Sequence, residues 1–415
     1  MKINWKKLVS GSLATVFALS AVVSTAGAIT EVSAEGETLV VSAAGVYDYV
    51  IDHIAEFEEE YGVTVEVMDA DMFEMLDGIA LDGPAGTGAD VYISPYDRIG
   101  SLGLTGQLAP VTLLEDAGYD ETDIQQVSAN EQVFGSPAVI ESLVMYYNTD
   151  LLDAAPETFA DLEALAEDDA YAFANEEGKN IGFLAKWTDF YFSYGLISGY
   201  GGYVFGSEGT DFSDIGLNTP EAIEGIEYAV NWFQNVWPQG MQDVTASGDF
   251  VTQSFIAGDT AAIIGGPWEA AAFTEAGVPF GVAKIPTLLN GEEYSAFGGG
   301  KGWVISNYSE NKELAQQFID WVSSEEQQNN LYTKLNEIPA NHAARQVAID
   351  AGNELTSAVI ASYENAVPMP NIPQMSEVWV GAENLMFDAA SGNKTAEESA
   401  NDAVQLIKDT IEQKY

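Results

Sequence analysis

The chain has 415 residues, which predicts two or three domains at roughly 100–200 residues each. Hydrophobic residues make up 47% and aromatic residues 11%, enough for large buried cores, so a mainly disordered chain is excluded. The formal net charge is −51, and a surface this acidic repels nucleic-acid phosphates and anionic lipids. Cysteine is absent and only His53 and His342 carry imidazoles, which excludes disulfides, thiol catalysis and multi-histidine metal sites.

The first residues have the pattern of a secretory signal peptide. A basic start with three lysines precedes the apolar stretch Leu8–Val23, and Ala26-Gly27-Ala28 provides small residues for cleavage. The stretch is shorter than the ~20 residues that a membrane-spanning helix needs. We predict a signal peptide over residues 1–28, with cleavage after Ala34 as the alternative. The mature chain is then exported, extracellular or periplasmic and associated with the cell envelope, without a lipobox cysteine.

The mature chain opens with a β-α-β pattern. Residues 38–41 form a short apolar run that is typical of a buried strand. A helix that ends at Gly62 follows, because apolar residues recur there every three or four positions. These residues are Val50, Ile54, Phe57 and Tyr61. Residues 63–67 and 89–94 predict further strands. A strand, a helix and a strand in this order predict a parallel sheet.

Helix signals continue to the end of the chain. Thr219 and Pro220 begin one helix as N-cap and first residue, and the capping box Thr395–Glu398 begins the last one. Strands and helices alternate throughout, so the fold class is α/β. No linker divides the chain, which favours lobes connected by several crossings over domains joined in a row.

Motifs of several enzyme classes are missing. The chain has no Gly-x-Ser-x-Gly elbow, and its glycine-rich segments at 83–88 and 298–302 match neither a dinucleotide fingerprint nor a phosphate-binding loop. Asp69-Ala70-Asp71 does not continue into a calcium loop. We expect neither a metal nor a cofactor. A glycosidase is not excluded, because it needs only two carboxylates.

Aromatic residues stand beside hydrogen-bonding groups in several segments. These segments are 187–194, 201–203, 265–268, 369–379 and Tyr96-Asp97-Arg98. The apolar face of a sugar ring stacks on an aromatic ring, and its hydroxyls pair with arginine and carboxylate groups. An aromatic residue taken alone more often packs in a core, and Asp97-Arg98 alone is more often a surface ion pair. The residues therefore favour carbohydrate binding only modestly.

Longer motifs carry a family resemblance. They are Tyr96-Asp97-Arg98-Ile99-Gly100, Pro137–Leu143, Tyr147–Leu152, Gly201–Phe205, Gly265–Trp268, Ala389–Gly392 and, most specific, Met369–Ser376 followed by Trp379. With them the sequence resembles the maltose/maltodextrin-binding proteins, the extracellular solute-binding receptors of bacterial ABC sugar importers. The matching segments cover nearly all of the mature chain.

The resemblance implies a set of ligand-binding residues. The principal ones are Asp97, Arg98, Glu141, Asp189, Tyr191, Phe192, Trp268, Met369 and Trp379, and the weaker ones are Tyr47, Trp187 and Ser94. Some positions depart from the family pattern. Residues 45–48 lack the family's Asp-Lys pair, and Ser94 replaces a tryptophan. These departures leave the preferred length and linkage of the sugar open.

The resemblance also implies a two-lobe, periplasmic-binding-protein-like fold with a hinge of several crossovers. We expect the first lobe at 36–139 and 298–348, the second at 144–297 and 355–415, and crossovers near 140–143, 295–298 and 349–354. The implied function is a monomeric receptor that closes on a maltooligosaccharide and delivers it to an ABC permease in the membrane, without catalysis.

Two other functions stay open. One is a secreted carbohydrate-active enzyme, with Asp97, Glu141 and Asp189 as candidate carboxylates. The other is a solute-binding protein for a different oligosaccharide or for a non-sugar ligand. The scarcity of histidine and the absence of cysteine argue against a metal as that ligand.

Overall fold

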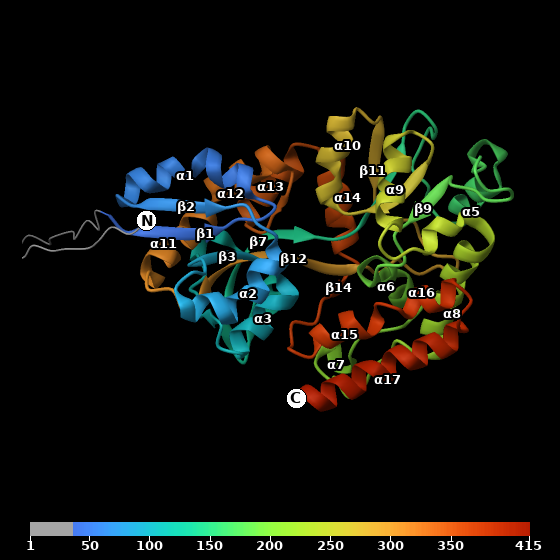
Figure 1. The fold of residues 1–415 in the computed structure, drawn as a ribbon. Helices are drawn as coiled ribbons and strands as arrows, with labels where there is room; N and C mark the ends of the chain where they lie inside the picture. The colour runs from blue at the N-terminus through green and yellow to red at the C-terminus, as the bar shows by residue number, and fades with distance from the viewer. Residues whose placement is uncertain (1–35) are drawn as a thin grey trace, which may run out of the picture.

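The computed structural model describes residues 36–415. The predicted signal peptide, residues 1–28, lies outside these residues and stays a prediction. Among the described residues, no helix combines the length and the apolar character needed to cross a bilayer. The chain forms two lobes, each built around its own sheet and covered by helices (Figure 1).

The predicted β-α-β opening is confirmed. Strand β1 (Thr38–Ser42) leads into helix α1 (Tyr47–Tyr61) and strand β2 (Thr64–Met68). The two strands pair in parallel, with Thr38 opposite Thr64. Gly62 ends the helix with a φ of 68°, a left-handed conformation that favours glycine because it has no Cβ. Strand β3 (Val91–Pro95) then pairs in parallel with β1.

The first lobe contains an eight-stranded sheet in the order β13-β7-β12-β3-β1-β2, with β4 and β14 paired to β12. The strands not yet named are β4 (Leu108–Ala109), β7 (Gly135–Glu141), β12 (Phe297–Ser306), β13 (Ile338–Pro339) and β14 (Val367–Pro368). The expectation of a parallel sheet is confirmed for β1, β2 and β3, but the sheet as a whole is mixed, because β12 runs antiparallel to both β3 and β7. Strand β12 enters from the second lobe, so it crosses the sheet in the opposite direction.

Helices cover both faces of this sheet. They are α2 (Met72–Ala85), α3 (Tyr96–Leu104), α4 (Glu121–Gln126), α11 (Lys312–Val322), α12 (Glu325–Leu335) and α13 (His342–Asp350). Phe57 of α1, Phe318 of α11 and Leu331 of α12 pack in one core. Leu76 of α2 and Ile99 of α3 pack in another. The positions of α2 and α3 bring their N-terminal ends to the C-terminal edge of β2 and β3.

The second lobe contains a four-stranded sheet in the order β11-β8-β10-β9. Its strands are β8 (Val144–Asn148), β9 (Phe183–Ala185), β10 (Ala262–Gly265) and β11 (Phe280–Ala283). Strand β8 runs antiparallel to both β10 and β11. A separate pair of short strands, β5 (Ser128–Ala129) and β6 (Gln132–Val133), forms a hairpin outside the two large sheets.

Most of the remaining helices pack in the core of the second lobe. The helices are α5 (Phe159–Glu167), α6 (Phe190–Gly199), α7 (Gly206–Gly209), α8 (Pro220–Asn231), α9 (Ser247–Ile256), α10 (Ala270–Ala276), α14 (Glu354–Tyr363), α15 (Met375–Ala382), α16 (Leu385–Ala390) and α17 (Ala396–Lys414). The predicted starts are confirmed. Thr219 accepts a hydrogen bond from the N–H of Ala222 in α8, and Thr395 and Glu398 form the capping box of α17.

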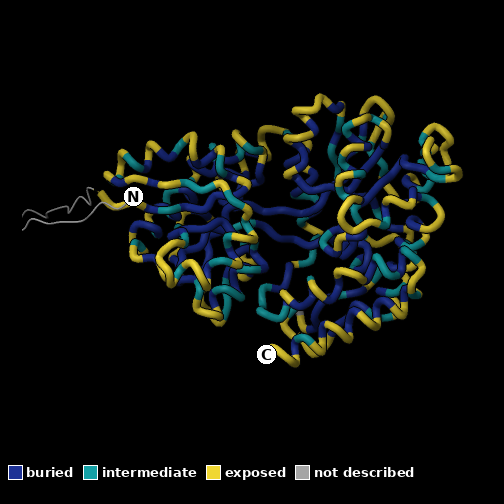
Figure 2. The backbone as a smooth tube through the Cα atoms, viewed as in Figure 1, coloured by how far each residue is buried: buried dark blue, intermediate teal, exposed yellow. Residues whose placement is uncertain are grey.

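The chain passes between the lobes more than once. Strand β7 ends at Glu141 in the large sheet and β8 begins at Val144 in the other. Strand β11 ends at Ala283 in the small sheet, and β12 begins at Phe297. Figure 1 shows β7 and β12 leading from one lobe toward the other, and Figure 2 shows that these segments are buried. Several connections at one junction permit a hinge motion without separating the lobes.

Candidate ligand-binding cleft

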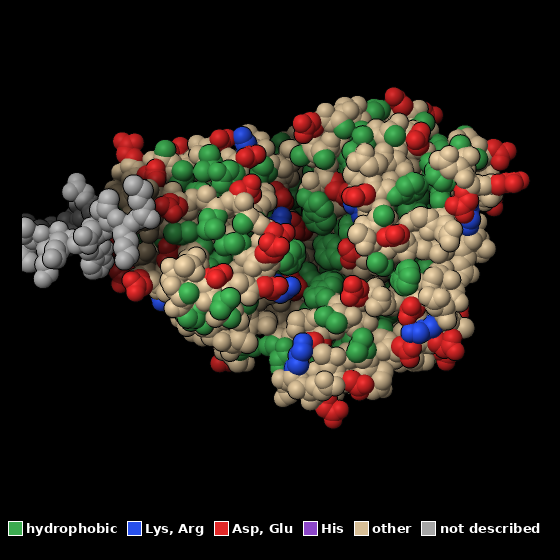
Figure 3. All heavy atoms as spheres, in the orientation of Figure 1, with side chains coloured by type: hydrophobic (Ala, Val, Ile, Leu, Met, Phe, Trp, Pro, Cys, Tyr) green, Lys and Arg blue, Asp and Glu red, His purple; other side chains and the backbone are tan. Residues whose placement is uncertain are grey.

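A cavity of about 550 Å³ lies between the lobes. It is lined by Met72, Phe73, Pro95, Asp97, Arg98, Glu141, Asp189, Tyr191, Phe192, Trp268, Gly300, Lys301, Met369 and Trp379. In the space-filling view, acidic side chains are spread over the visible face, whereas hydrophobic side chains gather in the hollow between the two halves (Figure 3). A largely apolar cavity with a few polar groups is the usual form of a small-molecule site.

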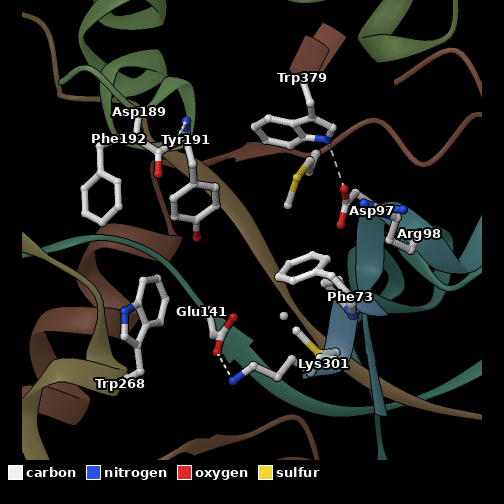
Figure 4. Close-up of a pocket in the computed structure, with 14 residues that line it drawn as sticks. Phe73, Asp97, Arg98, Glu141, Asp189, Tyr191, Phe192, Trp268, Lys301 and Trp379 are labelled. Atoms are coloured by element: carbon white, nitrogen blue, oxygen red, sulfur yellow. Dashed lines mark hydrogen bonds and ion pairs between the residues drawn. The ribbon is translucent and has the colours of Figure 1, made fainter. Parts of the chain in front are cut away.

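Tyr191, Phe192 and Trp268 form an aromatic wall on the second lobe. Figure 4 shows them on the side of the cavity opposite Asp97 and Phe73. Tyr191 lies in the first turn of α6, and its ring centroid lies 6.1 Å from that of Trp268 at an angle of 51°. Trp268 is 41% exposed, which is unusual for the largest apolar side chain. These rings therefore present apolar surface to the cavity.

The turn that carries Trp268 is held from behind. Glu269 accepts a hydrogen bond from the N–H of Gly266 at 3.0 Å and forms an ion pair with Lys186 at 2.7 Å. Tyr146 donates its hydroxyl to the carbonyl of Gly266 at 2.9 Å. A Cβ at position 266 would come within 2.1 Å of the Trp268 ring, so any larger residue there would displace the ring from its present position. Trp268 is exposed to the cavity on a rigid turn.

Asp97 and Trp379 connect the two sides of the cavity. Asp97 lies in the first turn of α3, and its carboxylate accepts a hydrogen bond from the indole Nε1 of Trp379 in α15 at 3.2 Å. Burial raises the pKa of the Asp97 carboxyl, although Arg98 and the indole N–H oppose that shift. The neighbouring Arg98 instead forms an ion pair with Asp77, at 3.0 Å.

Asp189 is both a helix cap and a cavity residue. Its carboxylate caps α6 by accepting the N–H of Tyr191 at 2.9 Å. The side chain is open to the solvent of the cleft, yet the cleft walls surround it. The walls partly remove water from the carboxylate, which raises the pKa of Asp189. The N–H of Tyr191 and the charge of Lys186 oppose this rise.

Glu141 belongs to a buried charge triad at the floor of the cleft. The Nζ atom of Lys301 in β12 lies 2.5 Å from Glu141 at the end of β7 and 3.2 Å from Glu337, just before β13. Burial raises the pKa of Glu141, with Lys301 opposing that shift. Burial would lower the pKa of Lys301, but the two carboxylates hold it above its ordinary value. The triad therefore links β7, β12 and the residue that precedes β13 by ion pairs.

The structure brings every principal predicted residue to the cavity and none of the weaker ones. Trp187 is a correction: it is fully buried in the second-lobe core, where its Nε1 donates to the hydroxyl of Tyr294 at 3.1 Å. Ser94 is also buried, and its hydroxyl donates to the carbonyl of Pro95. Tyr47 begins α1 and does not line the cavity either.

Sequence reasoning missed several lining residues, above all Phe73 and Lys301. Phe73 lies on a helix with mostly apolar residues, so no local contrast marked it as a cleft residue. Lys301 stands alone in a run of glycines, which a buried strand rarely carries. Among the described residues, no cluster of histidine, cysteine, aspartate and glutamate is suited to hold a metal ion.

Comparisons with known proteins place this geometry in a family. The model of the bacterial extracellular solute-binding proteins matches residues 52–362. The chain belongs to this family. The maltodextrin-binding protein MdxE of Bacillus subtilis is 52% identical over 385 residues, which cover 92% of this chain and 92% of that protein.

Solved structures of this solute-binding family are similar as well. The maltose-binding protein MalE of Listeria monocytogenes, in complex with maltose, is 58% identical, with a TM-score of 0.83 over 92% of this chain and 99% of that one. MalX of Streptococcus pneumoniae, in complex with maltopentaose, is 52% identical, with a TM-score of 0.88 over 90% of this chain and 100% of that one. The predicted two-lobe fold and family membership are confirmed.

Proposed function

We propose that this protein is an extracellular receptor for maltooligosaccharides that serves an ABC importer. The observation that carries the proposal is the cavity, where aromatic rings of one lobe face carboxylates and a guanidinium of the other. Relatives with half or more of their residues in common are described as binding maltodextrin, maltose or maltopentaose. The apolar faces of glucosyl units suit the rings, and their hydroxyls suit the charged groups.

Ligand binding is coupled to closure because neither lobe contains a full site. Asp97, Arg98 and Glu141 come from the first lobe, whereas Tyr191 and Trp268 come from the second. A sugar that contacts both groups binds the closed form more tightly than the open form, and it shifts the population by that difference. The closed form then docks on the membrane permease. We place the lobe boundaries and the crossovers at the positions expected from the sequence, except that β14 pairs with the start of β12 at the junction of the lobes.

The carboxylates of the cleft act as hydrogen-bond acceptors and not as catalysts. Asp97 already accepts the indole N–H of Trp379, Asp189 caps α6, and Glu141 is paired with Lys301. A glycosidase instead needs one carboxylic acid free to protonate the leaving oxygen. Incubation with maltodextrin tests this point: unchanged oligosaccharides are expected, and shorter products would favour the enzyme. We also expect an exported monomer, which size-exclusion chromatography with light scattering would check.

Calorimetry with maltotriose tests the assigned site. We expect Trp268→Ala and Trp379→Ala each to weaken binding up to about tenfold, because a stacked aromatic pair contributes about 0.5–1.5 kcal/mol. Phe212→Ala is the matched control, since Phe212 is also 41% exposed but lies outside the cleft. Unchanged binding in both tryptophan variants would contradict the site. A thermal-shift panel of other oligosaccharides, amino acids and metals distinguishes the alternative ligands.

A further inference from the structure

A second hollow of about 410 Å³ adjoins the main cavity on the first lobe. It lies between the turn at Ala44-Gly45 and residues 69–73, and Met72, Phe73 and Lys301 line both spaces. Figure 4 shows the Phe73 ring reaching into the cavity between Asp97 and Lys301. Phe73 therefore stands where the two spaces meet, and one ligand can extend past it from the main cavity into the hollow.

The Phe73 ring is exposed, and the side chain of Arg98 packs against it. Its exposed fraction is 47%, although α2 buries Leu76 and Ile79 on its other face. The guanidinium of Arg98 lies over the ring, 5.6 Å from its centroid.

Arg98 is itself held in place by the same helix. Its Nη1 forms an ion pair at 3.0 Å with Asp77, which lies one turn after Phe73 on α2. At the start of that helix, Asp71 accepts the N–H of Glu74 at 2.9 Å and fixes the first turn. A salt bridge and a cation–π contact thus position an apolar ring that stays about half exposed. Such pre-organisation reduces the entropy lost when a ligand stacks on the ring.

We propose that Phe73 is the stacking platform of an additional subsite, which takes a further glucosyl unit of a chain already bound in the main cavity. This inference rests on the proposed function and extends it to sugar length. Phenylalanine has no polar atom, so the ring recognises only the apolar face of a pyranose. Lys301 also lines the hollow, with its ammonium paired to Glu141 and Glu337. The receptor therefore prefers oligosaccharides that extend past the main cavity over maltose.

Calorimetry with maltose, maltotriose and maltotetraose tests the subsite. In Phe73→Ala we expect maltotetraose binding to weaken about three- to tenfold, while maltose binding changes by less than about twofold. Phe73→Tyr keeps a ring and should restore the preference for longer sugars, which also distinguishes lost stacking from poor folding. Leu81→Ala is the control, because Leu81 lies on the same helix, is 76% exposed and lines neither space.

The outcomes separate this inference from the proposed function. A wild-type protein that binds none of the three sugars overturns the proposed function, and the subsite with it. A wild-type protein that binds them, together with a Phe73→Ala variant that loses affinity equally for all lengths or for none, overturns the subsite alone. A length preference that falls in Phe73→Ala and returns in Phe73→Tyr supports the subsite.

Discussion

Replacing Lys301 by methionine tests the charge triad at the cleft floor. The substitution keeps most of the side-chain volume but removes the ammonium that pairs with Glu141 and Glu337. All three side chains are nearly buried, with exposed fractions of 12%, 9% and 8% for Lys301, Glu141 and Glu337. The variant therefore leaves two carboxylates close together in a poorly solvated place, where neither finds another cation.

Two routes give the size of the effect. Removing one partner of a buried ion pair costs about 3–5 kcal/mol of folding free energy, because the remaining charge is uncompensated. The protein can escape part of this cost by protonating Glu141, whose ordinary pKa is 4.5. At pH 7 that protonation costs about 3.4 kcal/mol, since each pH unit above the ordinary pKa costs about 1.4 kcal/mol. We therefore expect Lys301→Met to lower the free energy of unfolding by about 3–5 kcal/mol near neutral pH.

The loss of stability in Lys301→Met should depend on pH, and the direction follows from the pKa of Glu141. In Lys301→Met the pKa of Glu141 rises further, because Lys301 opposes the burial that already raises it. A carboxyl with a raised pKa in the folded state stabilises the folded protein at low pH. This contribution is lost as the pH rises through the pKa of the folded state. The difference in stability between wild type and variant should therefore shrink from about pH 8 to about pH 5.

Urea denaturation of the sugar-free protein measures this difference, followed by both tryptophan fluorescence and circular dichroism so that two-state behaviour is checked. Lys334→Met is the matched control, because Lys334 lies 2.6 Å from Asp52 but both side chains are largely exposed. It should change stability little at any pH. An equal effect of the two substitutions, or a gap that widens on acidification, would refute the reasoning.

Three further predictions concern stability and binding. Gly103→Ala should destabilise the first lobe by about 1–3 kcal/mol in thermal unfolding, because a Cβ there would lie 2.4 Å from the Phe134 ring; an unchanged melting temperature would show that the ring moves freely. Thr395→Ala should cost about 1 kcal/mol in urea unfolding by removing the cap of α17, whereas Thr395→Ser should not. Maltotriose affinity should fall as the pH is lowered from about 7 to about 4, because protonation of Asp97 removes an ionised acceptor. The fall should begin at a higher pH than for an exposed aspartate, because burial raises the pKa of Asp97. A constant affinity would contradict the role of Asp97 as an ionised acceptor.

Local structure was predictable from the sequence because it depends on residues near one another in the chain. The apolar period of residues 50–61 and Gly62 predicted α1 and its end, and the Thr395 capping box predicted the start of α17. The family resemblance selected the principal site residues, Trp268 and Trp379 among them, and the structure brings these into one cavity.

Only the tertiary structure decided which polar and aromatic groups face the cleft. Trp187 and Trp268 both stand in aromatic-rich segments, yet one fills the second-lobe core and the other is exposed on a turn held by Glu269. Lys301 meets Glu141 and Glu337 only because β7, β12 and β13 are neighbours in the sheet. Burial and charge pairing are set by residues far apart in the chain, and local patterns carry no information about such distances.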